Sequence, residues 1–569
     1  MAARDWLTEY QSSGYSQPLL LLLLPPSVLL CAAWLYLRYL YVDFAPLKGI
    51  PEIPGGSLLY GHLKLLGKDH ATTAQQWAEQ YGWPIFQVRL GYRRVVFLNG
   101  FQVAREWLVT HQAATIDRPT FYTFHGVVSK TSAATVGTNP WNERTKKQRL
   151  VVGSLTTAPA IQRLASMIDL ETSQMVKSIF QASKIGSTEV MPHLSQKRLA
   201  LNIVLMFCYG RRFDDIDDPL LLGILRDASL ISTFRSTSGN AQDYVPYLRY
   251  LPSFLKDKKR MAMATEVRTR RDKWLASLLQ EVEDNIAVGQ ATNCVAAGLL
   301  TDTDGGITNC KALHVSGLGF KMLMSSNADD VRTILGGLMS GGFETVFSTT
   351  IAGIAYLASP DGQIAQQRAY DDIVQSYGSP TEAFDRAVHE EKSSYMVAFV
   401  RETLRCYPPS HLLPPRQMFK DCDCGGVQVP KGLMVLVNCQ SVNRDPATYG
   451  PDAHLFRPER WLDKDTPYNV PPPYEFAFGA GTRGCTAINF SNRILYATFV
   501  RLITTFRIRQ SEKQPPCLHY IDYNCDTSVT VACPKDFKAS FQLRDRKTFD
   551  ASLARSQEKT ISVTNGIVK

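Results

Sequence analysis

The stretch "FAFGAGTRGCTA", from Phe476 to Ala487, surrounds one cysteine with three glycines and one arginine. Glycine has no Cβ, so the backbone can pass close to a bulky ligand here. The glycines also spell G-x-G-x-x-G, but the preceding "NVPPPYEFAF" is too rich in proline for a central strand. The next acidic residue, Glu512, is too distant for a dinucleotide-binding motif, and no Gly-Lys-Ser/Thr follows for a phosphate loop.

Two explanations of this loop remain: a glycine turn that carries a buried cysteine, and a site for haem with a thiolate ligand. The haem explanation uses more of the residues. Phe478 can pack against the macrocycle, Cys485 can supply the axial thiolate, and Arg483 can pair with a propionate. The helix predicted after the cysteine would direct its first amides at the sulfur and stabilise the thiolate.

The pattern Phe478-x-x-Gly481-x-Arg483-x-Cys485-x-Ala487 resembles the signature of the cytochrome P450 family, in which glycine is more usual at the last position. Three further motifs follow in the family's order. They are Gly341-Gly342-Phe343-Glu344-Thr345, Glu402-Thr403-Leu404-Arg405 and Pro458-Glu459-Arg460. The resemblance covers nearly all of the chain after residue 56. It implies a cytochrome P450 fold, mainly α with small β-sheets, and haem b as the cofactor.

The resemblance implies a role for each matching position. Cys485 would be the metal ligand, and Phe478, Gly481 and Arg483 would contact the haem. Glu402, Arg405 and Arg460 would form a buried charge network that fixes the fold beneath it. Glu344 and Thr345 would manage protons on the oxygen side. The alternative for Thr345 is a hydroxyl that bonds back to a helix carbonyl.

Cations for the haem propionates are expected from two more places. Arg416, in "LLPPRQ", matches a family arginine, and Trp141 matches the start of the family's Trp-x-x-x-Arg helix. The arginine of that helix is replaced by Thr145, and we expect Arg144 or Lys146 to substitute for it. The basic residues of the same helix offer a second use, which is contact with an acidic reductase surface; these are Lys146, Lys147 and Arg149.

The N-terminal region predicts a membrane anchor. "PLLLLLLPPSVLLCAAWLYL", from Pro18 to Leu37, has 20 residues without a charge, about the length that crosses a hydrocarbon core of ~30 Å. A cleaved signal peptide is the alternative, but the apolar stretch is long and no clear A-x-A site follows it. The excess of Lys and Arg after the span places the body on the cytosolic face of the endoplasmic reticulum.

The domain boundaries follow from this anchor. We expect an N-terminal segment at 1–17, an anchor at 18–38, a Pro/Gly linker at 39–56, a catalytic domain at 57–546 and a flexible polar tail at 547–569.

Periodicity predicts a long apolar helix over 328–359. The net charge of +10 is spread along the chain, so nucleic acid is not an expected partner. The twelve cysteines are scattered, which fits a reducing compartment.

Other stretches point to a substrate. "FQVRLGYRRVVFLN", "RPTFYTFHGVVS" and "FRSTSGNAQDYVPYLRYLP" resemble fungal phenylacetate hydroxylases. They also resemble enzymes that hydroxylate m-cresol or 3-hydroxybenzyl alcohol in patulin-type polyketide pathways. The aromatic residues of 118–136 would line a small pocket or simply pack. The cysteine loop and long N-terminus depart from the phenylacetate enzymes, which favours mycotoxin-type secondary metabolism over catabolism.

The expected activity is therefore a monooxygenase that takes electrons from NADPH through cytochrome P450 reductase and uses O2 on a small aromatic substrate. A haem-thiolate isomerase or dehydratase is one alternative, but the intact Gly-Gly-x-Glu-Thr element argues against it. A membrane-tethered nucleotide-binding or scaffold protein is an alternative of another class.

Cys422-Asp423-Cys424 has no Cys/His companions at zinc spacing, and we expect a turn there.

Overall fold

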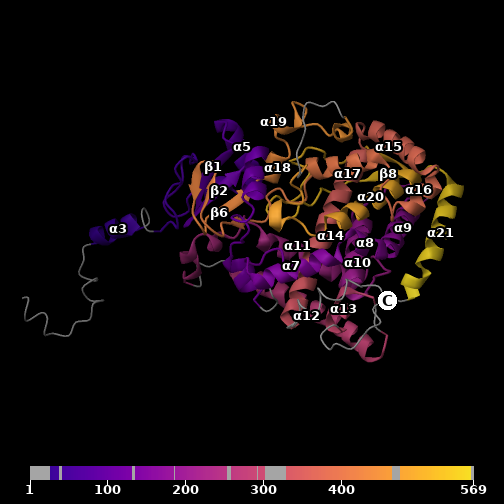
Figure 1. Cartoon of the computed structure of the whole chain (residues 1–569), viewed down its shortest axis with the longest axis horizontal. Coiled ribbons are helices and arrows are strands. Elements are labelled where there is room, and N and C mark those ends of the chain that lie inside the picture. Colours follow the sequence, from indigo (N-terminus) through magenta and orange to yellow (C-terminus); the bar gives the residue numbers. More distant parts are fainter. Residues whose placement is uncertain are drawn as a thin grey trace, which may run out of the picture.

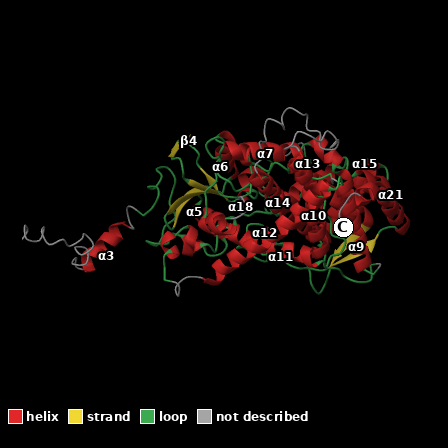
Figure 2. Cartoon of the chain, turned by 90° about the horizontal axis from the view of Figure 1, so that it is seen from below, coloured by secondary structure: helices red, strands yellow, loops and turns green. Residues whose placement is uncertain are grey.

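The computed structural model describes residues 26–36, 41–130, 135–184, 186–252, 258–290, 293–301, 328–463 and 474–565. Its body is mainly helical, with small sheets, as the sequence predicts (Figures 1 and 2). The longer helices are α5 (His70–Tyr81), α7 (Glu143–Leu155), α9 (Ala165–Ala182), α10 (His193–Tyr209), α11 (Pro219–Arg235), α12 (Lys258–Ala287), α14 (Ala328–Ala358), α15 (Gly362–Tyr377), α17 (Ser394–Cys406), α20 (Ile488–Thr505) and α21 (Arg546–Asn565).

Shorter helical segments connect these elements. The α-helices among them are α3 (Pro26–Leu35), α4 (Leu63–Leu66), α6 (Phe101–Arg105), α8 (Ala158–Arg163), α13 (Val295–Thr301), α16 (Pro380–Arg386), α18 (Cys439–Val442) and α19 (Pro446–Tyr449). Two are π-helices, η2 (Glu106–Thr110) and η3 (Tyr122–Val128). The 3-10 turns are η4 (Ala241–Asp243), η5 (Pro246–Arg249), η7 (Pro458–Trp461) and η8 (Gly481–Arg483).

The largest sheet lies at one end of the body (Figure 1) and has the order β1-β2-β6-β3. Its strands are β1 (Ile85–Leu90), β2 (Arg93–Leu98), β6 (Met434–Val437) and β3 (Arg416–Gln417). β1 and β2 form an antiparallel hairpin, and β2 pairs in parallel with β6, with Val96 opposite Val435. Two further two-stranded antiparallel sheets pair β4 (Cys422–Cys424) with β5 (Val427–Val429), and β7 (Phe506–Gln510) with β8 (Ala539–Leu543).

The described part of the expected linker, 41–56, belongs to the body. Ile50 and Ile53 are only 4% and 3% exposed. Gln87, in the middle of β1, accepts an N–H bond from Ile53 at its carbonyl and donates its side-chain amide to the carbonyl of Ile50. A buried polar side chain needs such partners, so Gln87 fixes this segment along the sheet instead of leaving it as a spacer.

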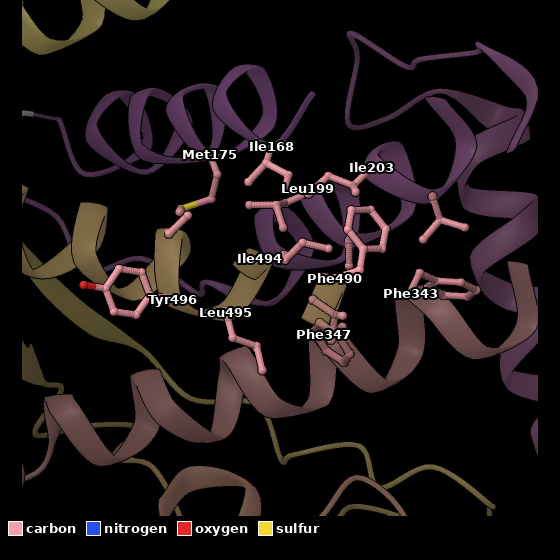
Figure 3. Packing of buried hydrophobic residues seen from close by; sticks show 14 of the residues in the cluster. Ile168, Met175, Leu199, Ile203, Phe343, Phe347, Phe490, Ile494, Leu495 and Tyr496 are labelled. Carbon is pink, nitrogen blue, oxygen red and sulfur yellow. The ribbon is translucent and has the colours of Figure 1, made fainter. Parts of the chain in front are cut away.

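The core of the helical part is built around α14, whose bounds match the prediction of 328–359 to within one residue. α10 and α20 pack on it, and Figure 3 shows Phe343 and Phe347 of α14 among side chains of both helices. A Cβ at Gly353 would lie 2.3 Å from the ring of Phe499. Glycine at this position therefore sets how closely α14 and α20 approach.

The prediction of a flexible C-terminal tail at 547–569 is wrong for the residues that the structure describes. They form α21, which packs on α9 and α16 (Figure 1). Phe549 is 4% exposed and its ring contacts that of Phe180 at a tilt, and Ser556 donates to the buried carboxylate of Asp169. The polar composition misled the prediction because this helix buries serines and threonines that hydrogen-bond inward.

The expected anchor at 18–38 lies largely outside the described residues. Its described part contributes α3, a helix of ten residues without a charged side chain. Within the described ranges, we find no helix whose length and apolar character would let it cross a bilayer.

Candidate functional site

The cysteine loop is held by its own backbone and by η2. The N–H of Cys485 donates to the carbonyl of Phe478 over 2.8 Å. Gly481 has a φ of 62°, and a Cβ there would lie 2.0 Å from the carbonyl oxygen of Leu108. Since an L-residue neither favours this φ nor fits this space, Gly481 supports the loop from behind.

Cys485 lies just before α20, as the sequence predicts. The N–H of Ala487 points at the sulfur with a distance of 3.4 Å. Burial raises the pKa of the Cys485 thiol, whereas the Ala487 N–H and the charge of Arg149 act to lower it. A coordinated metal ion would remove the thiol proton outright, and the amide and the cation would then stabilise the thiolate.

A cavity of about 300 Å³ separates Cys485 from α14. Phe478 lines it beside the cysteine, and Gly341, Gly342 and Thr345 line it from α14. The loop and the oxygen-side motif, about 145 residues apart in the sequence, thus face one another across a space. This arrangement fits a flat cofactor ligated from the cysteine side.

Arginines crowd this cavity without acidic partners. Arg118, Arg149, Arg416 and Arg483 all line it. Their hydrogen bonds go to backbone carbonyls, and no described carboxylate lies within ion-pair distance of any of them. Burial and the neighbouring arginines lower the pKa of Arg416 to about 9, and burial followed by Arg149 lowers the pKa of Arg483 to about 9.

Two nitrogens of Arg483, Nε and Nη1, are buried without a hydrogen-bond partner. Buried polar atoms are normally paired, and buried cations repel one another strongly. An anion with two carboxylates would resolve both problems. The four arginines therefore fit the propionates of haem, and Cys485 fits its axial ligand.

The substitute for the missing helix arginine at Thr145 is Arg149, one turn further along α7. Arg144 pairs with Asp330 at the surface, and Lys146 is exposed beside Glu143. Arg149 instead reaches the cysteine loop, where it donates to the carbonyls of Thr482 and Gly484. The expectation of Arg144 or Lys146 was wrong because positions four apart share a helix face, and only Arg149 continues the face of Thr145 toward the cavity.

The contact of Trp141 with the haem stays a prediction. Trp141 is not among the described residues that line the cavity. Its ring lies against Arg483, with 5.6 Å between the guanidinium carbon and the ring centroid, and the backbone N–H of Trp141 donates to the carboxylate of Asp117. Trp141 therefore positions an arginine of the cluster through a cation–π contact.

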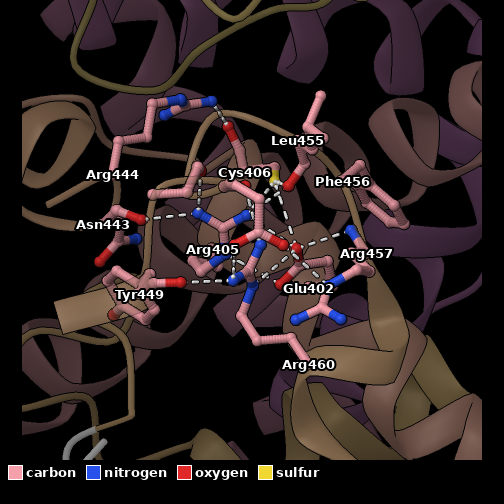
Figure 4. Close-up of polar contacts among 12 residues, drawn as sticks. Glu402, Arg405, Cys406, Asn443, Arg444, Tyr449, Leu455, Phe456, Arg457 and Arg460 are labelled. Atoms are coloured by element: carbon pink, nitrogen blue, oxygen red, sulfur yellow. Dashed lines mark hydrogen bonds and ion pairs between the residues drawn. The ribbon is translucent and has the colours of Figure 1, made fainter. Parts of the chain in front are cut away.

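Glu402, Arg405 and Arg460 meet as the motif implied (Figure 4). The carboxylate of Glu402 receives two bonds from Arg405, at 2.7 and 2.8 Å, and further N–H bonds from Arg457 and Trp461. Burial alone would raise the pKa of Glu402, but Arg405 and Arg460 hold it below its usual range. Both Glu402 and Arg405 are 0% exposed, so this network is an internal part of the fold.

The predicted proton-handling pair is divided between two cavities. Thr345 lines the cavity of Cys485, but its hydroxyl donates to the carbonyl of Gly341 over 2.8 Å, which is the alternative that the sequence left open. Glu344 lines a second cavity of about 400 Å³, between α11, α12 and α14. Burial raises the pKa of Glu344 to about 7, against the opposing charges of Arg235 and Lys197.

Arg235, at the end of α11, is a cavity residue that the sequence did not reveal. It lines both cavities, next to Thr345 in one and Glu344 in the other. Its Nε is buried without a partner, and it makes no hydrogen bond or ion pair with a described residue. Its guanidinium lies over the ring of Phe124, 5.5 Å from the centroid. No pattern in "TFRSTSGN" distinguishes this arginine from a surface one.

Comparison with known proteins decides the family. The model of the cytochrome P450 family matches residues 51–523. The chain belongs to the cytochrome P450 family. Phenylacetate 2-hydroxylase of Emericella nidulans is 36% identical over 91% of this cytochrome P450 and 95% of its own length. 3-hydroxyphenylacetate 6-hydroxylase of the same organism is 32% identical over 86% and 88%, respectively.

This cytochrome P450 is a monooxygenase that hydroxylates aromatic compounds, with haem and a thiolate ligand as cofactor. Electrons come from NADPH through a reductase. The haem supplies the activation of O2, one atom of which enters the substrate while the other leaves as water. The residues of this chain would hold the cofactor through Cys485 and the arginine cluster, and they shape the space above it.

Proposed function

We propose that this enzyme hydroxylates a small monocyclic aromatic acid of the arylacetate type. Arg235 is the observation that carries this proposal. A buried cation without a hydrogen-bonded anion is costly, and a carboxylate is the anion whose geometry best matches a guanidinium. Arg235 lines the same cavity as Cys485 and Thr345, so a carboxylate held there would leave a short aromatic ring in the space over the cofactor.

Arg235 is separate from the arginines assigned to the haem. Burial lowers the pKa of both Arg235 and Arg118. The neighbouring charges that also shift the pKa are Glu344 and Arg271 for Arg235, whereas for Arg118 they are mainly Arg416, Arg483 and Arg149. The two Emericella relatives are named as hydroxylases of phenylacetate and 3-hydroxyphenylacetate, which agrees with an acid as substrate.

The phenols m-cresol and 3-hydroxybenzyl alcohol, as in a patulin-type secondary metabolite pathway, are the second candidates. Support comes from the aromatic residues near the cavities: Phe124 lines the larger one, and Phe121 and His125 line a smaller space beside it. An uncharged phenol would leave Arg235 without an anion, which places these substrates second.

We also propose that residues 18–38 anchor the enzyme in the endoplasmic reticulum membrane, with the catalytic domain on the cytosolic side.

The test compares binding and products for phenylacetate, m-cresol and 3-hydroxybenzyl alcohol. Microsomes with the enzyme, reductase and NADPH give the products, and the haem absorbance shift gives the dissociation constants. Arg235→Met should weaken phenylacetate binding about 10- to 100-fold, the range for loss of a charged hydrogen bond, and should leave m-cresol binding unchanged. Arg332→Met, at an exposed position of the larger cavity, is the matched control. Tight binding and turnover of only the phenols would contradict the proposal.

A further inference from the structure

A second group of ligating side chains lies outside the haem cavity. Nδ1 of His111 lies 3.3 Å from Sγ of Cys422, although the residues are 311 positions apart. With Cys424, their three ligating atoms lie within 4.8 Å of one another. No other trio of potential metal ligands comes together in the part of the chain that the structure describes.

The fold builds this group from two rigid pieces. Cys422 and Cys424 lie on β4, which pairs with β5, so they are not in the turn that the sequence suggested. Side chains two apart on a strand project from the same face, and both thiols therefore point the same way. His111 directly follows η2, and the N–H of Phe419 donates to the carbonyl of Ala114 over 2.7 Å, which ties the two pieces together.

The other nitrogen of His111 is already committed. Nε2 lies 2.9 Å from Oε1 of Glu106. An N–H at Nε2 that donates to this carboxylate leaves Nδ1 with its lone pair toward Cys422. Histidines that bind metals have this arrangement, because the carboxylate fixes the tautomer, orients the ring and raises its basicity.

We propose that His111, Cys422 and Cys424 bind a zinc ion. Two sulfurs and one imidazole are ligands for zinc and other soft transition metals, and they exclude Mg²⁺ and Ca²⁺. Zn–S and Zn–N bonds of about 2.3 and 2.0 Å in a tetrahedron place neighbouring ligand atoms roughly 3.5 to 3.8 Å apart. The spacing in this group requires only small side-chain adjustments to reach those values.

The proposed zinc ion can take a water molecule as its fourth ligand, because one side of the group is exposed to solvent. Cys424 is 3% exposed, whereas the side chain of His111 is 26% exposed. Solvent can thus reach the ion from the histidine side, while the buried thiol closes the other side.

The ion would brace the haem-binding loop from behind. Gln112, the neighbour of His111, accepts a hydrogen bond from the hydroxyl of Thr482 over 3.0 Å. Its Cβ also lies 2.9 Å from the position where a Cβ would stand on Gly481. A metal that joins His111 to β4 would hold this contact, and with it the loop that presents Cys485.

The test is metal binding by the haem-loaded, full-length enzyme. The reduced protein is equilibrated with two equivalents of Zn²⁺, passed over a desalting column, and analysed by elemental mass spectrometry with iron as the internal standard. We expect one zinc per iron for the wild type and less than about a tenth of that for Cys422→Ser and His111→Gln. Wild-type haem content and ferrous-CO spectra in these variants would show that they fold.

The chain offers a matched control. Cys525 and Cys533 also form a close thiol pair, joined by a backbone hydrogen bond, but they are not part of a trio of described ligands. The double variant Cys525→Ser/Cys533→Ser should keep its zinc. The proposal is overturned if the wild type retains no more zinc than Cys422→Ser, if the control loses zinc equally, or if a thiol count on protein purified without a reductant finds Cys422 and Cys424 joined as a disulfide.

Discussion

Two buried sets of arginines in this enzyme differ in what neutralises them. In the first set, the anion is the carboxylate of Glu402, and Arg405 donates hydrogen bonds to it and to backbone carbonyls (Figure 4). Beside Cys485, the arginines find only carbonyls, and Arg483 keeps two nitrogens unpaired. Arg405 and Arg460 of the first set have carboxylate partners within the protein, although Nε of Arg460 makes no hydrogen bond. The arginines of the second set have no described carboxylate partner and would be neutralised by a ligand. Buried cations that are paired with internal carboxylates therefore indicate a structural part, and a group of cations without anions indicates a binding site.

The largest effect should come from removing the internal anion of the Glu402 network. Glu402→Gln leaves Arg405 buried without a countercharge, and we expect the free energy of unfolding to fall by about 3–5 kcal/mol. Chemical denaturation followed by circular dichroism measures this. The control is Glu391→Gln, which breaks a partly exposed pair with Arg493 and should cost less than about 1 kcal/mol. Equal effects in both variants would show that Glu402 is not a special partner.

The second set should respond through the ligand. Arg149→Met removes one cation from the cluster, and we expect haem to be lost to an excess of a scavenging haem-binding protein about 10- to 100-fold faster. Unfolding of the haem-free protein should change little, because relief of repulsion offsets the lost bonds to Thr482 and Gly484. Arg144→Met, at the surface of the same helix, should leave haem loss unchanged. If it accelerates haem loss as much, Arg149 has no particular role at the cofactor.

The pair of Glu344 and Arg235 is an intermediate case, and its effect should be the smallest. Because burial raises the pKa of Glu344 to about 7, the side chain is neutral below that pH and anionic above it. As an anion it competes with a substrate carboxylate for Arg235, so phenylacetate binding should weaken about three- to tenfold between pH 6 and pH 8. Glu344→Gln should flatten this dependence, which titrations of the haem absorbance shift can follow. A dependence that persists in Glu344→Gln belongs to another group.

The sequence predicted most of what short motifs and periodicity can encode. It located Cys485, the Glu402 network and the bounds of α14, since those features depend on residues close together in the chain. The functional residues that the sequence did not predict are those whose neighbours are set by the folded structure. Arg149 replaces Thr145 because a helix face repeats after four residues, and His111 reaches Cys422 across 311 positions. Arg235 lies in a stretch that resembles phenylacetate hydroxylases, but nothing in that stretch singles out the arginine. Only the structure shows that Arg235 lines both cavities without an ion pair to a described carboxylate.

The position of α21 has a consequence for how the chain matures. Asp169, on α9, accepts hydrogen bonds from Arg501 and from Ser556, the latter 387 residues later. Until α21 has left the ribosome, the carboxylate of Asp169 lacks the hydrogen bond from Ser556. The face of α9 that packs on α21 is then still exposed to solvent. Domains generally fold as units during synthesis. Here the unit closes only after α21 has been made, so a stop codon before residue 546 would release a catalytic domain with part of α9 uncovered.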